Sequence, residues 1–385
     1  MTQFNDFQIS AALKKRLAAC NFITPTPVQA GAIPPALEGR DVLATAQTGT
    51  GKTLSFLIPI FEQLQAQSLS IPSKSGSALI LLPTRELAMQ VERAFHAIAQ
   101  GTSLDVALVV GGLAEGPQIQ ALRRGARLIV ATPGRLEDYI QRRLVKLSGI
   151  RTLVLDECDR MLDMGFRPAI KRIVAELPAD RQTLCYSATL DAQMKDVVRE
   201  YLKDPVRIEV GSVLKPSENI RLRTFEVTSD KKQELLEHLL KSEEGSFLVF
   251  VRTKHGAERV AKRLCRSGHI ATSIHGDRTQ AQRSAALRSF ARGGHRILVA
   301  TDVAARGIDV DHVAHVVNYD LPKVAEDFVH RVGRTGRASK KGVASTFAQP
   351  EERGELRKIE RALRISMERF RVRPAAPSNP SLVPA

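Results

Sequence analysis

The stretch that decides the fold is DVLATAQTGTGKTLSFLIPIFEQLQ, Asp41–Gln65. A short apolar run, a glycine-rich loop and a helix-forming segment follow one another, which is typical of a phosphate site. Glycines let backbone N–H groups curl around phosphate oxygens, and the helix N-terminus adds partial positive charge. Lys52 is expected to reach the β- and γ-phosphates and Thr53 to ligate Mg²⁺. Ala46 stands where the general pattern has its first glycine, and a chance glycine-rich turn is the alternative interpretation.

The same order of strand, loop and helix recurs along the chain. Short β-prone runs that alternate with helical stretches predict a parallel sheet with helices on both faces. In the first half these runs are Asp41–Ala46, Ala78–Pro83, Leu104–Val110, Arg127–Thr132, Thr152–Glu157 and Thr183–Thr189. In the second half they are Ser246–Val251, Ala271–Gly276, Arg296–Thr301 and His315–Asp320.

A polar segment in which the alternation lapses marks the predicted domain boundary. The sequence therefore predicts an α/β protein with two tandem domains, residues 1–208 and 220–371, joined by a linker, residues 209–219. Residues 372–385 are rich in proline and small residues, which predicts a disordered tail.

The net charge of the chain bears on its partners, and its cysteines and apolar runs bear on its cellular compartment. The 385 residues carry a formal net charge of +16, which suggests a polyanionic partner such as nucleic acid, although a merely basic surface is the alternative. No two of the four cysteines have the C-x-x-C spacing of a zinc or redox site, so a reducing compartment is expected. Without a signal peptide or a long apolar run, the protein is expected to be cytoplasmic.

The segment TLVLDECDRMLDMGF, Thr152–Phe166, passes from an apolar run into a cluster of acids. An acid at the end of a strand neighbouring the phosphate loop completes a Mg²⁺ site, and Asp156 fits that position, largely through bound water. Glu157 would then orient or deprotonate the attacking water. Asp159 could instead cap the following helix.

Cys158 lies among these acids and does not have the surroundings of a nucleophile. Adjacent carboxylates oppose formation of a thiolate and should raise the pKa of Cys158. We therefore expect a small packed residue at this position.

These motifs and others resemble the DEAD-box ATP-dependent RNA helicases, with DECD in place of DEAD. Asn21–Gln29 resembles the Q motif, with Asn21 at the position of the family's glycine, and AQTGTGKT matches motif I with its alanine. The other similar blocks are PTRELA (Pro83–Ala88), GG (Gly111–Gly112), TPGR (Thr132–Arg135), SAT (Ser187–Thr189), LVFVRTKHGA (Leu248–Ala257), HGDRTQAQR (His275–Arg283), ATDVAARGID (Ala300–Asp309) and HRVGRTGR (His330–Arg337). The wording of the blocks is most similar to the bacterial RhlE-like branch.

The resemblance implies two RecA-like domains with ATP and Mg²⁺ between them, and it implies a role for each matching residue. The residues implied to bind ATP are Phe4, Thr24, Gln29, Ala46, Gln47, Thr48, Gly49, Thr50, Gly51, Lys52, Thr53, Gly307 and Asp309. The catalytic residues are Lys52, Asp156, Glu157, His330, Arg334 and Arg337, the two arginines acting as fingers on the γ-phosphate.

RNA is implied to cross both domains. Its expected contacts are Pro83, Thr84, Arg85, Gly111, Gly112, Thr132, Pro133, Gly134, Arg135, Arg252, Thr253, Gly276 and Thr301. Phosphate and sugar contacts carry little sequence information, and a chain with 5% aromatic residues and no tryptophan has few rings for base stacking. Weak sequence preference is therefore expected.

The implied activity is local unwinding of short RNA duplexes and remodelling of RNA or RNA–protein complexes by a monomer. Protein partners in ribosome assembly or RNA decay are conceivable. The main alternative is an ATP-gated RNA clamp with little unwinding. A second alternative, a DNA translocase, is disfavoured by the PTPVQ and PTRELA blocks.

Overall fold

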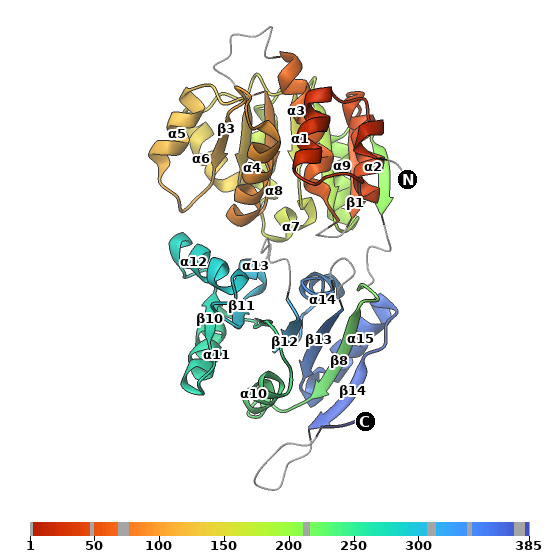
Figure 1. Cartoon of the computed structure of the whole chain (residues 1–385), viewed down its shortest axis with the longest axis vertical. Helices are drawn as coiled ribbons and strands as arrows, with labels where there is room; N and C mark the ends of the chain where they lie inside the picture. The colour runs from red at the N-terminus through yellow and green to blue at the C-terminus, as the bar shows by residue number, and fades with distance from the viewer. Residues whose placement is uncertain are drawn as a thin grey trace. The chain divides into compact units, whose positions relative to one another are not determined.

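The computed structural model describes residues 3–46, 50–67, 77–210, 216–305, 313–336, 341–372 and 382–384. The chain divides into two compact units, Met1–Val213 and Leu214–Ala385. Each unit is an α/β sheet covered by helices, so the predicted fold class is confirmed (Figure 1). Within the described residues, no helix is both long and apolar enough to cross a membrane.

The first unit contains a parallel sheet of seven strands in the order β3-β4-β2-β5-β6-β1-β7. Its strands are β1 (Val42–Ala46), β2 (Ala78–Leu81), β3 (Val106–Val109), β4 (Leu128–Ala131), β5 (Thr152–Leu155), β6 (Gln182–Ser187) and β7 (Val206–Val210). Its helices are η1 (Phe4–Asp6), α1 (Ala11–Ala19), α2 (Pro27–Leu37), α3 (Lys52–Gln67), α4 (Arg85–Ala99), α5 (Glu115–Arg123), α6 (Pro133–Gln141), α7 (Cys158–Asp163), α8 (Arg167–Ala175) and α9 (Ala192–Tyr201).

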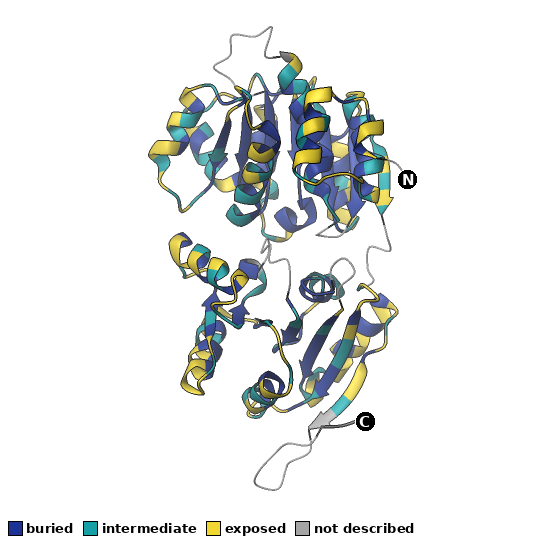
Figure 2. Ribbon diagram, viewed as in Figure 1, coloured by how far each residue is buried: buried dark blue, intermediate teal, exposed yellow. Residues whose placement is uncertain are grey.

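Alternate residues of each central strand enter two different cores, because side chains of a strand alternate between the faces of the sheet. On β2, Ile80 packs with residues of α1 to α4, whereas Leu79 and Leu81 pack with residues of α5 to α9. Both faces are therefore apolar, and the strands form the band of buried residues through the centre of the unit (Figure 2). This is why the strands are continuous apolar runs in the sequence.

The second unit contains eight strands in the order β10-β11-β9-β12-β13-β8-β14-β15, parallel except for the last pair. The strands are β8 (Ile220–Glu226), β9 (Phe247–Phe250), β10 (Ala271–Ile274), β11 (Ile297–Ala300), β12 (His315–Asn318), β13 (Gly342–Ala348), β14 (Glu368–Val372) and β15 (Leu382–Pro384). The helices are α10 (Lys232–Ser242), α11 (Lys254–Arg266), α12 (Gln280–Ala291), α13 (Asp302–Ala305), α14 (Ala325–Val332), η2 (Pro350–Glu352) and α15 (Arg353–Leu363).

Five strands of the structure were not among the predicted runs, namely β7, β8, β13, β14 and β15, and two of them, β7 and β15, also differ from the predicted linker and tail. β7 ends at Val210, two residues inside the segment predicted as a linker. β15 lies inside the predicted disordered tail and pairs antiparallel with β14. Both are edge strands. β7 alternates apolar with charged residues because only part of an edge strand is covered, whereas β15 has three residues, too few to give a pattern.

Asp41 connects three strands at the amino-terminal edge of the first sheet. Its carboxylate accepts hydrogen bonds from the backbone N–H of Thr183 at 2.7 Å and of Lys203 at 2.6 Å. The bond from Thr183 is buried, and the bond from Lys203 is partly buried. β1, which leads into the phosphate loop, is therefore held in place at its start as well as along its length.

Replacement of Asp41 by alanine should lower the free energy of unfolding of the first unit by about 1–3 kcal/mol, the cost of leaving one buried donor, the Thr183 N–H, without a partner. Urea unfolding followed by circular dichroism measures the change. Asp180→Ala removes an exposed carboxylate from the same unit and serves as the control. Equal unfolding midpoints for the two variants would contradict this role for Asp41.

Candidate functional site

The phosphate loop joins β1 to α3, and its last glycine has a conformation that other residues rarely adopt. Gly51 has a φ of +87°, and a Cβ atom there would lie 2.7 Å from Nε2 of Gln29. Gln29 donates from Nε2 to the Gly51 carbonyl at 2.8 Å, and its Oε1 accepts from the Thr26 N–H at 2.8 Å. The Q-motif glutamine thus rests directly on the loop, and each end of its amide retains capacity for one more hydrogen bond.

Lys52 is the first residue of α3, and its buried ammonium group donates to the Ala46 carbonyl at 3.1 Å. Thr53 follows it and is partly exposed, and Thr50 is partly exposed within the loop. The predicted contacts Gln47, Thr48, Gly49, Gly307, Asp309 and Arg337 lie outside the described residues.

Asp156 follows β5, which is separated from β1 in the sheet only by β6. Its carboxyl group is buried, and burial raises the pKa of Asp156 to about 6, although the nearby Lys52 ammonium group opposes that rise. Its Oδ1 accepts from the Glu157 N–H at 2.9 Å. A cation bound beside this buried carboxyl group would favour its ionised form.

Glu157 is buried and has a left-handed backbone conformation, with φ +50° and ψ +48°. This conformation is uncommon outside glycine, asparagine and aspartate, and strained backbone of this kind is concentrated at functional sites. Its Oε2 lies 3.5 Å from Nε of Arg160, which is only 2% exposed. Nη1 and Nη2 of Arg160 are buried and have no hydrogen-bond partner in the described part of the chain. The sequence analysis did not identify Arg160, because a lone arginine in a basic chain carries no signal.

Asp159 does not cap the following helix, as one interpretation of the sequence proposed, because it lies inside the first turn of α7. Its Oδ2 accepts from the N–H groups of Ala188 and Thr189 at 2.9 and 3.0 Å and from the Thr189 hydroxyl at 3.2 Å. The last acid of the DECD motif therefore ties the end of β5 to the SAT segment after β6.

Cys158 is fully buried, and the thiol of Cys185 on β6 lies close enough to affect the pKa of Cys158. That contact is the largest cause of the raised pKa of Cys158, followed by burial, and the charges of Asp159 and Asp156 contribute less. The expected direction of the shift is correct, but its expected cause, the neighbouring carboxylates, is not the main one. Cys185 was not predicted, because the two thiols are 27 positions apart in the sequence.

Phe4, Asn21 and Thr24 precede Gln29 at the start of the chain. Asn21 has a φ of +60°, which explains why glycine or asparagine suits this position of the Q motif. Phe4 is 3% exposed, packs edge-on against Phe7 and donates its N–H to the Ile23 carbonyl at 3.1 Å. Thr24 is exposed.

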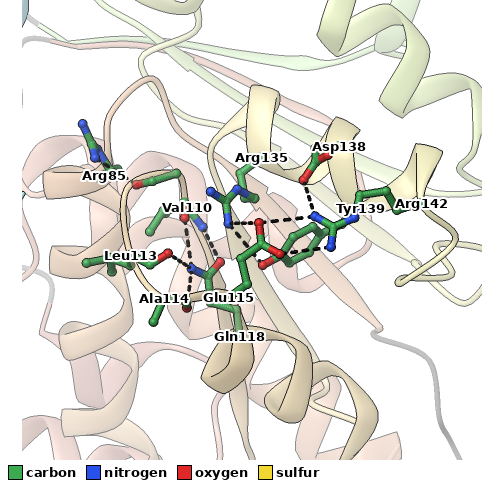
Figure 3. A network of polar contacts seen from close by, with 11 residues as sticks. Arg85, Val110, Leu113, Ala114, Glu115, Gln118, Arg135, Asp138, Tyr139 and Arg142 are labelled. Atoms are coloured by element: carbon green, nitrogen blue, oxygen red, sulfur yellow. Dashed lines mark hydrogen bonds and ion pairs between the residues drawn. The ribbon is translucent and has the colours of Figure 1, made fainter.

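A second group of predicted residues gathers around the carboxyl ends of β2, β3 and β4 (Figure 3). Pro83 and Thr84 are buried before α4, and Thr84 caps that helix by accepting from the Leu87 N–H at 3.3 Å. Arg85 donates from Nη1 to the Gly111 carbonyl at 3.0 Å. The exposed Gly112 has a φ of +75°, and a Cβ there would lie 1.7 Å from Arg85 Nη1.

TPGR forms the start of α6. Thr132 and Pro133 are buried, whereas Gly134 is exposed in the first turn. Arg135 pairs through Nη1 with Glu115 at 3.2 Å and donates to the Tyr139 hydroxyl at 3.3 Å. The free N–H groups of this helix start and the glycine loop both suit phosphate oxygens.

In the second unit, the predicted residues follow β9, β10 and β11 at the carboxyl edge of the sheet. Arg252, Thr253 and Gly276 are exposed, and Thr301 is partly exposed. Arg252 pairs with Glu352 at 3.3 Å.

The segment HRVGRTGR covers the end of α14. His330 is partly exposed and Arg334 is buried. Arg331, which the sequence analysis did not identify, is buried and binds Asp302 through Nε at 2.6 Å and Nη2 at 2.8 Å. It also donates to the Asp320 carbonyl at 2.7 Å, so it fixes α14 against α13 and β12.

Comparison with known proteins agrees with this arrangement. Residues 26–197 match the DEAD/DEAH box helicase family, and residues 230–339 match the helicase conserved C-terminal domain. The chain is 42% identical over 369 residues to the DEAD-box ATP-dependent RNA helicase CshA of Bacillus subtilis, covering 96% of this chain and 74% of the relative. The chain belongs to the DEAD-box RNA helicase family. CshA of Geobacillus kaustophilus is 41% identical over 372 residues, covering 96% of this chain and 79% of that one.

Solved helicase structures show the same fold. Dbp5 of S. cerevisiae bound to RNA and ADP BeF3 matches with a TM-score of 0.86 and 30% identity, covering 96% of each chain. Mss116 bound to ssRNA and UDP-BeF matches with a TM-score of 0.88 and 27% identity, covering 97% of this chain and 80% of that one. The chain is therefore a DEAD-box helicase with two RecA-like domains.

The raised pKa of Asp156 makes stability depend on pH. The pKa is about 6 in the folded protein and about 3.9 in an unfolded chain, so between these values the folded state binds more protons. The free energy of unfolding should therefore fall as the pH rises through this window. In the presence of a chelator, Asp156→Asn should be more stable than the wild type at pH 7, by up to about 3 kcal/mol, and the difference should vanish below about pH 4.

Thermal or urea unfolding across this pH range measures the effect. Asp180→Asn, at an exposed position, is the matched control and should show no pH-dependent difference from the wild type. A destabilised Asp156→Asn variant at pH 7 would show that the ionised carboxylate is favoured in the folded protein.

Replacement of Cys158 by alanine should leave an active RNA-stimulated ATPase. The side chain only fills space beside Cys185, and the small cavity should cost about 1 kcal/mol of stability. Phosphate release with saturating RNA measures the activity, with Cys185→Ala as the matched variant. Loss of turnover in Cys158→Ala with folding intact would assign a chemical role to the thiol.

Proposed function

We propose that this DEAD-box helicase couples ATP binding and hydrolysis to local unwinding of short RNA duplexes and to remodelling of RNA or RNA–protein complexes. The observation that carries the proposal is the buried set Lys52, Asp156 and Glu157, together with the Asp159 contacts to the SAT segment. Family membership supplies the reaction, in which ATP and water give ADP and phosphate.

Each residue of the buried set has a distinct task. Lys52 would leave the Ala46 carbonyl and hold the β- and γ-phosphates, while Glu157 directs the attacking water and takes its proton. Thr53 and Asp156 would hold Mg²⁺, which supplies charge neutralisation at the phosphates when bound. No cluster of three or more His, Cys, Asp or Glu able to hold a metal occurs in the described residues, which suits an ion held largely by phosphates and water.

The remaining proposed ATP contacts complete the site. Gln29 would use its spare donor and acceptor capacity on the adenine edge, with Phe4 and Thr24 beside it and Asp309 and Gly307 at the ribose. Arg334 and Arg337 would act as fingers on the γ-phosphate, and His330 would link Glu157 to the SAT segment when the domains close. A finger of this kind is typically worth about 10³–10⁵ in rate.

RNA would bind to the uncharged N–H groups at Gly112, Gly134 and Gly276 and to the charges of Arg85, Arg135 and Arg252. Dbp5 and Mss116 were solved with RNA or ssRNA bound, and both resemble this chain over at least 96% of its length. Contacts of this kind position a strand with little sequence preference. Closure on ATP and single-stranded RNA would bend the strand, and hydrolysis would release it.

Several finer assignments belong to the same proposal. We infer a monomer in a reducing cytoplasm, consistent with the four cysteines, which are all free. We group this chain with the RhlE-like branch from the residues of its motifs, whereas the similar Bacillus proteins are named CshA. Partners in ribosome assembly or RNA decay remain predictions.

The alternative activity is an ATP-gated clamp that holds RNA with little unwinding. Strand separation of a short labelled RNA duplex, measured with excess ATP, distinguishes the two. Separation that depends on added ATP supports the helicase, and long-lived RNA retention without separation supports the clamp. ATPase stimulation by RNA and by DNA of one sequence tests the choice of nucleic acid.

Replacement of Glu157 by glutamine should retain ATP and RNA binding and reduce RNA-stimulated turnover by about 10²-fold or more, because the amide cannot accept the proton of water. Phosphate release and fluorescent-nucleotide binding measure the two effects. Glu176→Gln, on an exposed position of the same unit, is the control. Turnover of Glu157→Gln near the wild-type rate would remove Glu157 from catalysis.

A further inference from the structure

The loop from Val110 to Ala114 carries two of the proposed RNA contacts, Gly111 and Gly112. It leaves the end of β3 and enters α5, and Gly112 has a left-handed φ with the guanidinium of Arg85 where a side chain would start. Ordering a loop that contains glycine loses much backbone conformational entropy. Its shape therefore depends on what holds it.

One buried side chain holds both ends of this loop. Gln118, on α5, accepts from the Val110 N–H at 3.0 Å and donates from Nε2 to the carbonyls of Val110 and Ala114, both at 3.1 Å. A longer contact reaches the Leu113 carbonyl at 3.4 Å. The amide points into the loop (Figure 3), and its residue is only 6% exposed. Both N–H groups of its amide are used within the protein and the side chain is buried, so Gln118 is not placed to touch RNA.

A second brace fixes the start of α5 against the TPGR helix α6. The Glu115 carboxylate bridges Arg135 at 3.2 Å and Arg142 at 3.0 Å. Both guanidinium groups lie over the buried Tyr139 ring, at 5.4 and 5.7 Å from its centre. Figure 3 shows the carboxylate between the two arginines. The loop and the helix start that are both proposed to bind RNA are thus parts of one rigid assembly.

We propose that Gln118 is a positioning residue for RNA binding, which holds the loop Val110–Ala114 in its RNA-binding shape before RNA arrives. The inference rests on the proposed function, in which this loop contacts the RNA backbone. Hydrogen bonds from one side chain to both ends of a five-residue loop remove most of its freedom in advance. RNA binding then loses less conformational entropy, because the loop is already ordered, and the affinity for RNA is higher.

The test replaces Gln118 by leucine, which has a similar volume and no hydrogen-bonding group. The RNA concentration that gives half-maximal ATPase stimulation should rise about tenfold, the factor for ordering about one further backbone residue on binding. Turnover at saturating RNA and the KM for ATP should stay within about twofold of wild type. Gln120→Leu, at an exposed position of the same helix, is the matched control and should leave the RNA dependence unchanged.

The salt dependence separates positioning from a lost ionic contact. The loop offers RNA uncharged N–H groups, so the slope of log affinity against log salt should be the same in Gln118→Leu and in the wild type. Arg135→Gln, in contrast, should reduce the slope by about 0.7, the value for one phosphate contact on a single strand. A reduced slope in Gln118→Leu would overturn the inference.

Hydrogen exchange of the RNA-free protein provides a second measurement, and Gln118→Asn a milder variant whose amide is one methylene shorter. Faster exchange confined to residues 110–114, with weakened RNA binding, supports positioning. Faster loop exchange with unchanged RNA affinity, or an equal loss of ATP and RNA affinity, overturns it. If RNA does not stimulate the wild type, the proposed function itself fails, whereas a stimulated wild type matched by both Gln118 variants refutes only this inference.

Discussion

Burial of three carboxylates at one strand end is the constraint on which the catalytic unit depends. Asp156, Glu157 and Asp159 each expose less than a tenth of their surface, and an unpaired buried charge is costly. The fold compensates each differently. Lys52 lies close enough to Asp156 to oppose the rise in its pKa, Arg160 pairs with Glu157, and Asp159 accepts three hydrogen bonds from the SAT segment.

At Asp156, the nearby positive charge of Lys52 does not fully offset the effect of burial on the pKa. Burial raises the pKa of Asp156 to about 6, so the ionised form that a cation needs is disfavoured there. Binding of a metal nucleotide would supply the missing positive charge and relieve that cost. The strained backbone of Glu157 and the unsatisfied guanidinium nitrogens of Arg160 lie beside it, so the least relaxed part of the unit coincides with the proposed chemistry.

The part of the same unit that we propose to bind RNA follows the opposite principle. Around the loop Val110–Ala114 the polar groups are paired, by Gln118 within the loop and by Glu115 between α5 and α6. Gly112 and Gly134, two of the proposed RNA contacts in this unit, are exposed. Contacts with the phosphate and sugar backbone would position RNA with little sequence information, so weak sequence preference stays a prediction.

The amino-acid sequence was enough to predict the α/β class, the central strands and the glycine-rich phosphate loop. Continuous apolar runs and the spacing of glycines are local properties of a sequence. It also predicted that Asp156 and Glu157 follow a buried strand. It did not reveal β7, β8, β13, β14 and β15. Of these, β7 and β8 mix apolar with charged residues, and β15 is only three residues long. The contacts of Cys158 with Cys185, Arg331 with Asp302 and Gln118 with its loop were decided by tertiary structure alone. Each depends on side chains from different elements meeting in space, and neither residue type nor spacing encodes that meeting.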